Sequence, residues 1–248
     1  MFTNILLFNC KIDILLPLFD QFWMTTRNGE TFQNVKLTIE LFNNLLSVST
    51  EVQESFYQYK AVNIISTMLY RASSKKKDLI DYTLYLQFYS LMQSLSYDPL
   101  VTSIMNIILL DCELWLRADS ENHLRIIRHW NRTLFTTLFS YISLSFQTIL
   151  YIMRVYYWYE PKAEEQEYIK CLDRTRKEKL NVGECRQLLS GIAQTIAAEN
   201  FTRNDLNCII SHCLTCSEQQ QVIDLLQLIR SLGMIEPSPL LHLNDSTE

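Results

Sequence analysis

The chain contains only four glycines in 248 residues, although glycine supplies most backbone positions that need a positive φ angle. They are Gly29, Gly183, Gly191 and Gly233. These positions are too scattered for a nucleotide-binding loop, where consecutive glycines let the backbone approach the phosphates. Because prolines are also few, with five in the chain, the composition favours long helices joined by short polar links. The sequence therefore argues against a P-loop or dinucleotide enzyme and predicts an all-α fold.

The overall composition is that of a globular protein, with 48% hydrophobic and 20% charged residues. A formal net charge of −5 provides no basic surface for nucleic acid, so we do not expect nucleic acid as a partner. The seven cysteines are an odd number without dense spacing, which is typical of reduced thiols in a cytoplasmic protein. The apolar N-terminus lacks a basic leader and is interrupted by Lys11 and Asp13, so it does not predict a signal peptide.

Local capping residues predict several helix starts. Asp98 precedes Pro99, which predicts a capping aspartate followed by a proline at the first helical position. Thr202 and Asp205 have the spacing of a capping box, and Ser217–Gln220 repeats that spacing. Each pair comes directly before an apolar run with helical periodicity.

Apolar periodicity predicts the remaining helices near 4–22, 32–48, 51–71 and 77–97. One further helical face begins at residue 185, and its apolar members are Cys185, Leu188, Leu189, Ile192, Ala193, Ile196 and Ala197. Successive helices of this length with short connections predict an armadillo/HEAT-like α-solenoid of stacked helix pairs. The number of helices is too high for a single four-helix bundle.

The strongest internal boundary is predicted at residues 161–180, which contain 11 charged side chains and form an exposed charged helix or a link. Residues 1–160 are then an N-terminal helical stack. Residues 181–235 hold the C-terminal helices of the same solenoid, and 236–248 are a disordered tail.

Residues 133–153 contain no charge and lie between Arg132 and Arg154. Their length and the aromatic residues that follow suit a membrane span. A stripe of threonine, serine and glutamine at helical spacing instead fits a helix that is wetted on one side. A membrane-anchored helical protein with a single span at 133–153 is therefore the alternative to the solenoid scaffold.

The sequence offers no set of residues that predicts catalysis or a cofactor. Cys208, Cys213 and Cys216 have a spacing seen in iron–sulfur proteins, but a fourth thiolate does not follow and helical offsets of this size converge poorly on one metal. Asp111–Glu113 surrounds a cysteine with acids, which raise a thiol pKa and do not activate it. We expect no enzyme, no metal and no cofactor.

A row of basic residues is the candidate interaction face. Arg125, Arg128, His129 and Arg132 lie along one side of a predicted helix, where they could contact phosphate headgroups or an acidic protein partner. A solvated helix face is the alternative interpretation of the same row.

Two parts of the C-terminal half resemble a known family. The first comprises LDCELWLRAD at 110–119 and QTILYIMRVYY at 147–157, and the second comprises CRQLLSGI at 185–192 and EQQQV at 218–222. These stretches resemble the armadillo-like region upstream of the pleckstrin-like and BEACH module in the neurobeachin family. The resemblance covers roughly residues 100 to 235.

The resemblance implies a non-enzymatic scaffold for vesicle trafficking and membrane-protein sorting, which binds proteins and lies in the cytoplasm or peripherally on endomembranes through other modules. Some relatives anchor a cyclic-AMP-dependent kinase, but their anchoring helix matches no position here. The chain lacks the pleckstrin-like, BEACH and WD-repeat modules that normally follow, so it is either a fragment or a protein without those roles.

Overall fold

The computed structural model describes residues 16, 23, 31–75, 79–134, 139–158, 179–216 and 219–234. Every regular element within these ranges is helical, as the sequence predicted. The chain divides into two compact units. Unit 1 comprises Met1–Ile126 with Ser140–Ile142, and unit 2 comprises Ile127–Phe139 with Ser143–Glu248.

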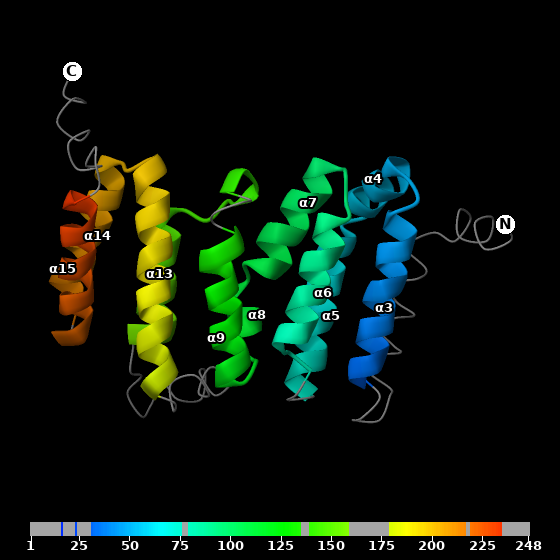
Figure 1. Ribbon diagram of the computed structural model, residues 1–248, viewed down its shortest axis with the longest axis horizontal. Helices are drawn as coiled ribbons and strands as arrows, with labels where there is room; N and C mark the ends of the chain where they lie inside the picture. The colour runs from blue at the N-terminus through cyan, green and yellow to red at the C-terminus, as the bar shows by residue number, and fades with distance from the viewer. Residues whose placement is uncertain are drawn as a thin grey trace, which may run out of the picture. The chain divides into compact units, whose positions relative to one another are not determined.

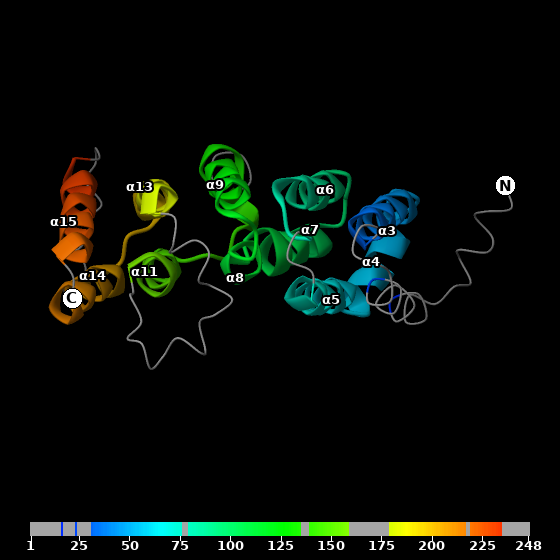
Figure 2. The same cartoon turned by 90° about the horizontal axis from the view of Figure 1, so that it is seen from below.

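Unit 1 is built from short antiparallel helices in two layers (Figures 1 and 2). Its elements are α3 (Thr31–Leu46), α4 (Thr50–Gln58), α5 (Ala61–Lys75), α6 (Tyr82–Gln93), α7 (Asp98–Ile104), η1 (Met105–Leu109), α8 (Cys112–Trp115), the first residues of α9 (Ser120–His129), and part of η3 (Phe139–Tyr141). In one layer α3 packs against α6, and in the other α5 packs against the π-helical η1. This arrangement is the helix pairing of an α-solenoid.

The core of unit 1 is centred on Trp115, which is fully buried. Its indole Nε1 donates to the Ile108 carbonyl at 2.7 Å, and its ring meets that of Tyr85 edge to face, with 5.2 Å between centroids. The carbonyl of Trp115 accepts from Nδ1 of His123 at 3.1 Å. Because His123 is also fully buried, burial lowers its pKa to about 4 and the ring is neutral at pH 7.

A buried glutamine joins three segments of unit 1. Gln53, which is 3% exposed, donates from Nε2 to the Leu46 carbonyl at 2.8 Å. Its Oε1 accepts from the backbone N–H groups of Ser96 at 3.0 Å and Tyr97 at 2.9 Å. The side chain therefore satisfies the end of α3 and the start of α7 while standing on α4.

The prediction of one continuous helix over residues 51–71 is wrong. The segment divides into α4 and α5, and Lys60 between them has a φ of 52°. This left-handed conformation is costly for a residue with a Cβ atom, and neither glycine nor proline marks it in the sequence. Nearby, α6 is shorter than the predicted 77–97, while α3 agrees closely with 32–48.

Asp98 does not cap its helix, contrary to prediction. Tyr97 occupies the cap position without a side-chain hydrogen bond, and Asp98 and Pro99 form the first turn. The Asp98 carboxylate instead accepts from the Tyr141 hydroxyl at 3.1 Å. Of the apolar positions predicted after Pro99, Leu100, Val101, Ile104, Met105 and Ile108 are buried, and Ile107 is partly exposed.

Unit 2 also has two layers. Its elements are the last residues of α9, the π-helical η2 (Trp130–Leu134), α11 (Phe146–Ile152), the π-helical η4 (Met153–Trp158), α13 (Lys179–Glu199), α14 (Arg203–Thr215) and α15 (Gln219–Gly233). Figure 2 shows α13 and α15 side by side in one layer and α11 and α14 in the other. Helix α13 contacts α11, η2, η4 and α15, so it is the central helix of this unit.

The local predictions for unit 2 are largely confirmed. Six of the seven apolar positions predicted on α13 are buried, and Leu188 is partly exposed. The capping box is present: Asp205 N donates to Thr202 Oγ1 at 3.3 Å, and Thr202 N donates to Asp205 Oδ2 at 2.8 Å. The box predicted at Ser217–Gln220 falls partly outside the described residues.

The predicted span at 133–153 is not one helix. Residues 135–138 lie outside the described part, η3 is a short 3-10 turn, and Ser145 has φ −87° and ψ 162°. This extended residue is the N-cap of α11, and its Oγ accepts from Thr148 N, so a new helix begins in the middle of the apolar run. Among the described residues, we find no helix with the length and hydropathy of a membrane span.

Three predictions concern residues that the structure does not describe, and they stay predictions. They are most of the helix near 4–22, the charged boundary at 161–180 and the tail at 236–248. The division into 1–160 and 181–235 depends on that boundary, so it also stays a prediction.

Candidate interaction surfaces

The predicted basic face begins at Arg125, which lies on α9 within unit 1. Its Nε pairs with Glu121 Oε1 one turn earlier, at 3.2 Å, and both side chains are more than half exposed. An exposed pair of this kind contributes little to stability. The pair does, however, partly neutralise the positive charge on this turn.

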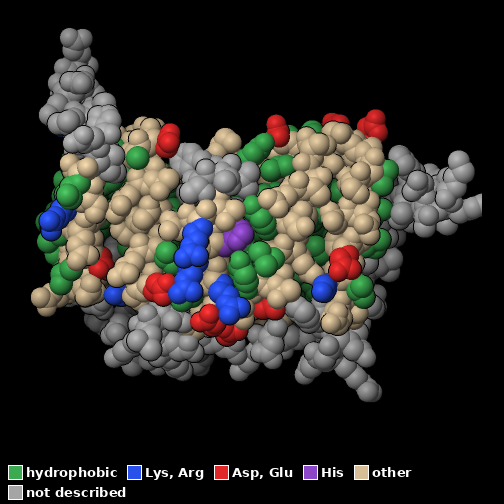
Figure 3. Space-filling model, viewed as in Figure 1, with side chains coloured by type: hydrophobic (Ala, Val, Ile, Leu, Met, Phe, Trp, Pro, Cys, Tyr) green, Lys and Arg blue, Asp and Glu red, His purple; other side chains and the backbone are tan. Residues whose placement is uncertain are grey.

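The other three members of the face lie in unit 2. Arg128 contacts Glu184 of α13, with Nη2 at 2.7 Å and Nε at 2.9 Å from Oε1. Burial lowers the pKa of His129, which is therefore neutral at pH 7. Arg132 is exposed and belongs to η2, where a π-helical turn replaces the regular spacing assumed in the prediction. In Figure 3, blue basic side chains over α9 lie beside red acidic ones.

The structure thus gives each of two arginines a carboxylate partner and leaves the face less basic than the sequence indicates. A phosphate or an acidic peptide would have to compete with Glu121 and Glu184 for the guanidinium groups. The assignment of these four residues as an interaction face stays a prediction.

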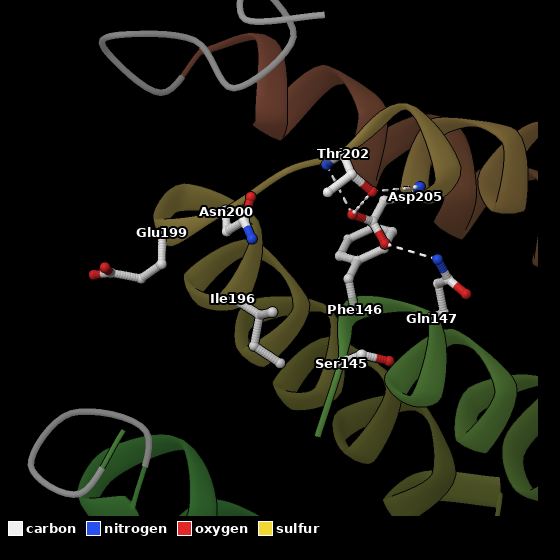
Figure 4. A pocket seen from close by; sticks show the side chains of 8 residues that line it. All are labelled: Ser145, Phe146, Gln147, Ile196, Glu199, Asn200, Thr202 and Asp205. Atoms are coloured by element: carbon white, nitrogen blue, oxygen red, sulfur yellow. Dashed lines mark hydrogen bonds between the residues drawn. The ribbon is translucent and has the colours of Figure 1, made fainter. Parts of the chain in front are cut away.

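A hollow of about 310 Å³ lies where α11, α13 and α14 meet in unit 2 (Figure 4). It is lined by Ser145, Phe146, Gln147, Ile196, Glu199, Asn200, Thr202 and Asp205. The Asp205 carboxylate accepts from Thr202 N at 2.8 Å, Thr202 Oγ1 at 2.6 Å and Gln147 Nε2 at 3.3 Å. Three hydrogen-bond donors therefore contact the Asp205 carboxylate, and these bonds hold the start of α14 against α11. They give the polar residues that line the hollow a structural role.

A second depression, which we call the polar groove, has a volume of about 360 Å³ and lies between α13 and α15. Its lining residues are Gly183, Arg186, Gln187, Ser190 and Gln194 of α13, and Gln220, Asp224, Gln227 and Ser231 of α15. On α15 the positions recur every three or four residues, and on α13 they do the same apart from the adjacent Arg186 and Gln187, so each set forms one stripe along its helix. The groove therefore runs along both helices.

An ion pair crosses the polar groove. Arg186 Nε lies 3.0 Å from Asp224 Oδ2, and the two side chains are only 21% and 15% exposed. Arg186 Nη1 also donates to the Tyr157 carbonyl at 3.3 Å, and Gln220 Nε2 donates to Asp224 Oδ1 at 2.7 Å. The pair joins α13 to α15 and contributes no net charge to the groove.

The cysteines of the suspected metal motif are dispersed along α14. Cys208 and Cys213 are partly exposed on this helix, and Cys216 follows its end. Burial raises the pKa of the Cys208 and Cys213 thiols, which keeps them protonated and disfavours metal binding. In the parts of the chain that the structure describes, no three His, Cys, Asp or Glu side chains gather in a way that could hold a metal ion.

The polar groove was not predicted from the sequence. The stripe of Gln187, Ser190 and Gln194 is visible beside the apolar face of α13, and Gln220, Gln227 and Ser231 form a similar stripe on α15. Their juxtaposition depends on α14, which reverses the chain between them. A periodicity analysis can find each stripe but not their pairing.

The family model described as Neurobeachin/BDCP, DUF4704 alpha solenoid region matches residues 11–247. The match extends well beyond residues 100 to 235, where the sequence motifs suggested a resemblance, and includes the N-terminal helices. No solved structure matches the chain.

Proposed function

Because the chain belongs to the family of the Neurobeachin/BDCP DUF4704 alpha solenoid region, we propose that it is a non-enzymatic scaffold segment that binds proteins in vesicle trafficking and membrane-protein sorting. The observation that carries this proposal is the match of the family model over nearly the whole chain. The layered helices support it, since they present long side-chain stripes such as those of the polar groove.

The proposal places the protein in the cytoplasm, peripherally on endomembranes, where a full-length neurobeachin-type protein attaches through its other modules. It extends to anchoring of a cyclic-AMP-dependent kinase by that full-length protein, for which we assign no residue of this chain. Arg125 and Arg132 are the proposed contacts for an acidic partner, because both side chains are exposed and a guanidinium can bind a carboxylate or phosphate through two parallel hydrogen bonds.

Proximity labelling tests the proposal. The chain, fused to a biotin ligase, is expressed in cultured cells beside the ligase alone and beside a variant carrying Arg125→Ala and Arg132→Ala. We expect vesicle and sorting proteins to be enriched by the wild-type chain, and part of this set to be lost in the double variant. Labelling identical to that of the ligase alone would contradict the scaffold function.

Fractionation tests the proposed location separately. Membranes that retain the protein are washed with alkaline carbonate, and the chain is detected by immunoblot. Release into the wash supports peripheral association, whereas retention in the pellet would contradict it.

A further inference from the structure

The polar groove has the hydrogen-bonding groups of a peptide backbone. Four of its nine lining residues are glutamines, two on each helix: Gln187, Gln194, Gln220 and Gln227. A carboxamide presents N–H donors and a carbonyl acceptor together, which are the two groups that each peptide unit needs to satisfy. Ser190 and Ser231 add hydroxyl groups that can donate or accept.

The charged residues of the groove argue against a charged ligand. Among the residues that the structure describes, Arg186 and Asp224 are the charged ones that line the groove, and they form an ion pair with each other. The described lining therefore carries no net charge and exerts little attraction on phosphates or charged peptides. Because none of the described lining residues has an aliphatic or aromatic side chain, a drug-like apolar ligand also lacks the surface that it needs.

The length of the groove suits an extended chain. Its lining residues extend from Gly183 to Gln194 on α13 and from Gln220 to Ser231 on α15, which is about 16 Å on each helix at the rise of an α-helix. An extended polypeptide covers that length with about five residues. The two glutamines of each stripe are two helical turns apart, about 10 Å, which equals about three residues of extended chain.

We propose that the polar groove between α13 and α15 binds an uncharged, extended polypeptide segment, whose backbone N–H and C=O groups pair with the glutamine carboxamides. This inference rests on the proposed function as a protein-binding scaffold, and it names the binding surface and the chemical class of the partner. Burial of the Arg186–Asp224 pair beneath the peptide would leave its charges matched.

Gly183 provides a means of blocking the groove. It lines the groove, and a Cβ atom at this position would meet no other atom within 4 Å. The backbone at this position therefore accepts a side chain, and the bulk of a tryptophan should obstruct the groove. The matched control is Gly191→Ala on the same helix, because Gly191 does not line the groove.

The probe is a phage-displayed library of random 12-residue peptides, panned on the 248-residue chain and counter-selected on the Gly183→Trp variant. Enriched peptides are titrated by fluorescence anisotropy. We expect Gly183→Trp to weaken binding at least tenfold, the double variant Gln187→Ala with Gln227→Ala to weaken it about tenfold, and Gly191→Ala to leave it unchanged. Circular dichroism establishes that each variant remains helical.

Two further measurements distinguish backbone recognition from other modes of binding. N-methylation of the peptide backbone removes its donors and should abolish binding, while raising the salt concentration should change the affinity less than twofold. The proposal is overturned if no peptide is enriched, if enriched peptides bind the Gly183→Trp variant as well as the wild type, or if N-methylated peptides bind equally. If proximity labelling still identifies sorting proteins in any of these cases, the scaffold function stands and only the groove assignment fails.

Discussion

The hydroxyl of Tyr70 lies 2.8 Å from each carboxylate oxygen of Asp111, 41 residues away in the sequence. Asp111 also caps α8 by accepting from Leu114 N at 3.1 Å. Arg117 lies over the Tyr70 ring, with its guanidinium carbon 4.7 Å from the centroid. Burial, followed by the charge of Asp111, raises the pKa of Tyr70 well above its ordinary value. The phenol is therefore a permanent donor that joins α5 to the start of α8.

Replacing Tyr70 by phenylalanine removes this donor and keeps the ring beneath Arg117. Since hydrogen bonds to charged groups contribute about 1.5–3 kcal/mol, we expect the free energy of unfolding to fall by about 2 kcal/mol. Urea denaturation measures the change. Tyr151→Phe, at a residue that is 59% exposed, is the control and should have little effect; equal stabilities for the two variants would refute the assigned role of Tyr70.

Replacement of the buried Gln53 should lower the free energy of unfolding further. Gln53→Met preserves the approximate volume but leaves the N–H groups of Ser96 and Tyr97 and the carbonyl of Leu46 without this partner. Unsatisfied buried groups cost about 1–3 kcal/mol each, so we expect a loss of roughly 3 kcal/mol in thermal or urea unfolding. The exposed Gln58 on the same helix is the control, and Gln58→Met should change stability by less than about 0.5 kcal/mol. A similar small effect at position 53 would show that water replaces the glutamine.

The features that were predictable from the sequence are those whose partners lie within one helical turn. The Thr202–Asp205 capping box and the apolar stripe of α13 depend only on near neighbours, and both are present. The all-α class likewise follows from composition and periodicity, which report on every segment.

The features that could not be predicted depend on distant partners. Asp98 has the sequence context of a helix cap, yet its carboxylate accepts a hydrogen bond from the hydroxyl of Tyr141, 43 residues later. No glycine or proline lies between residues 51 and 71 to signal a break, yet the chain turns at Lys60 and α4 packs against α5. The polar groove required the pairing of α13 with α15, which is tertiary information.

The buried His123 makes stability depend on pH. Because burial lowers its pKa to about 4 in the folded state, whereas the unfolded chain has the ordinary value near 6.5, the unfolded state binds the proton first as the pH falls. Above the pKa of the unfolded state, the titration of His123 does not change the free energy of unfolding. As the pH falls from there toward 4, the titration lowers this free energy by roughly 3 kcal/mol. Urea unfolding at pH 7, 5.5 and 4.5 measures the trend.

Other groups also titrate in this range, so the contribution of His123 is the difference between the wild type and His123→Asn. The variant is less stable at pH 7, because Asn is smaller and reaches the Trp115 carbonyl poorly, but it should lose less stability on acidification. Parallel pH profiles for the two proteins would contradict a titrating histidine at this position.

Because Lys60 has a positive φ, we expect glycine at this position to stabilise the fold. A left-handed residue with a Cβ atom costs about 1–2 kcal/mol, and glycine removes this cost while increasing the entropy of the unfolded chain. We therefore expect Lys60→Gly to raise the melting temperature slightly, with a net gain of up to about 1 kcal/mol. Lys60→Ala retains the Cβ atom and should show no such gain. If both variants behave alike, the backbone at Lys60 is not strained.

The two glycines of α13 separate helix propensity from packing. Glycine in a helix interior is about 1 kcal/mol less favourable than alanine, and neither position needs a positive φ. A Cβ atom at Gly183 would meet nothing within 4 Å, while one at Gly191 would lie 3.6 Å from Asn131 Oδ1, an ordinary van der Waals distance. Both Gly183→Ala and Gly191→Ala should therefore raise the free energy of unfolding by about 0.5–1 kcal/mol in urea titrations. Destabilisation by Gly191→Ala alone would mean that η2 packs against α13 too closely to admit a methyl group, whereas destabilisation by Gly183→Ala would contradict the open groove on which the peptide-binding proposal depends.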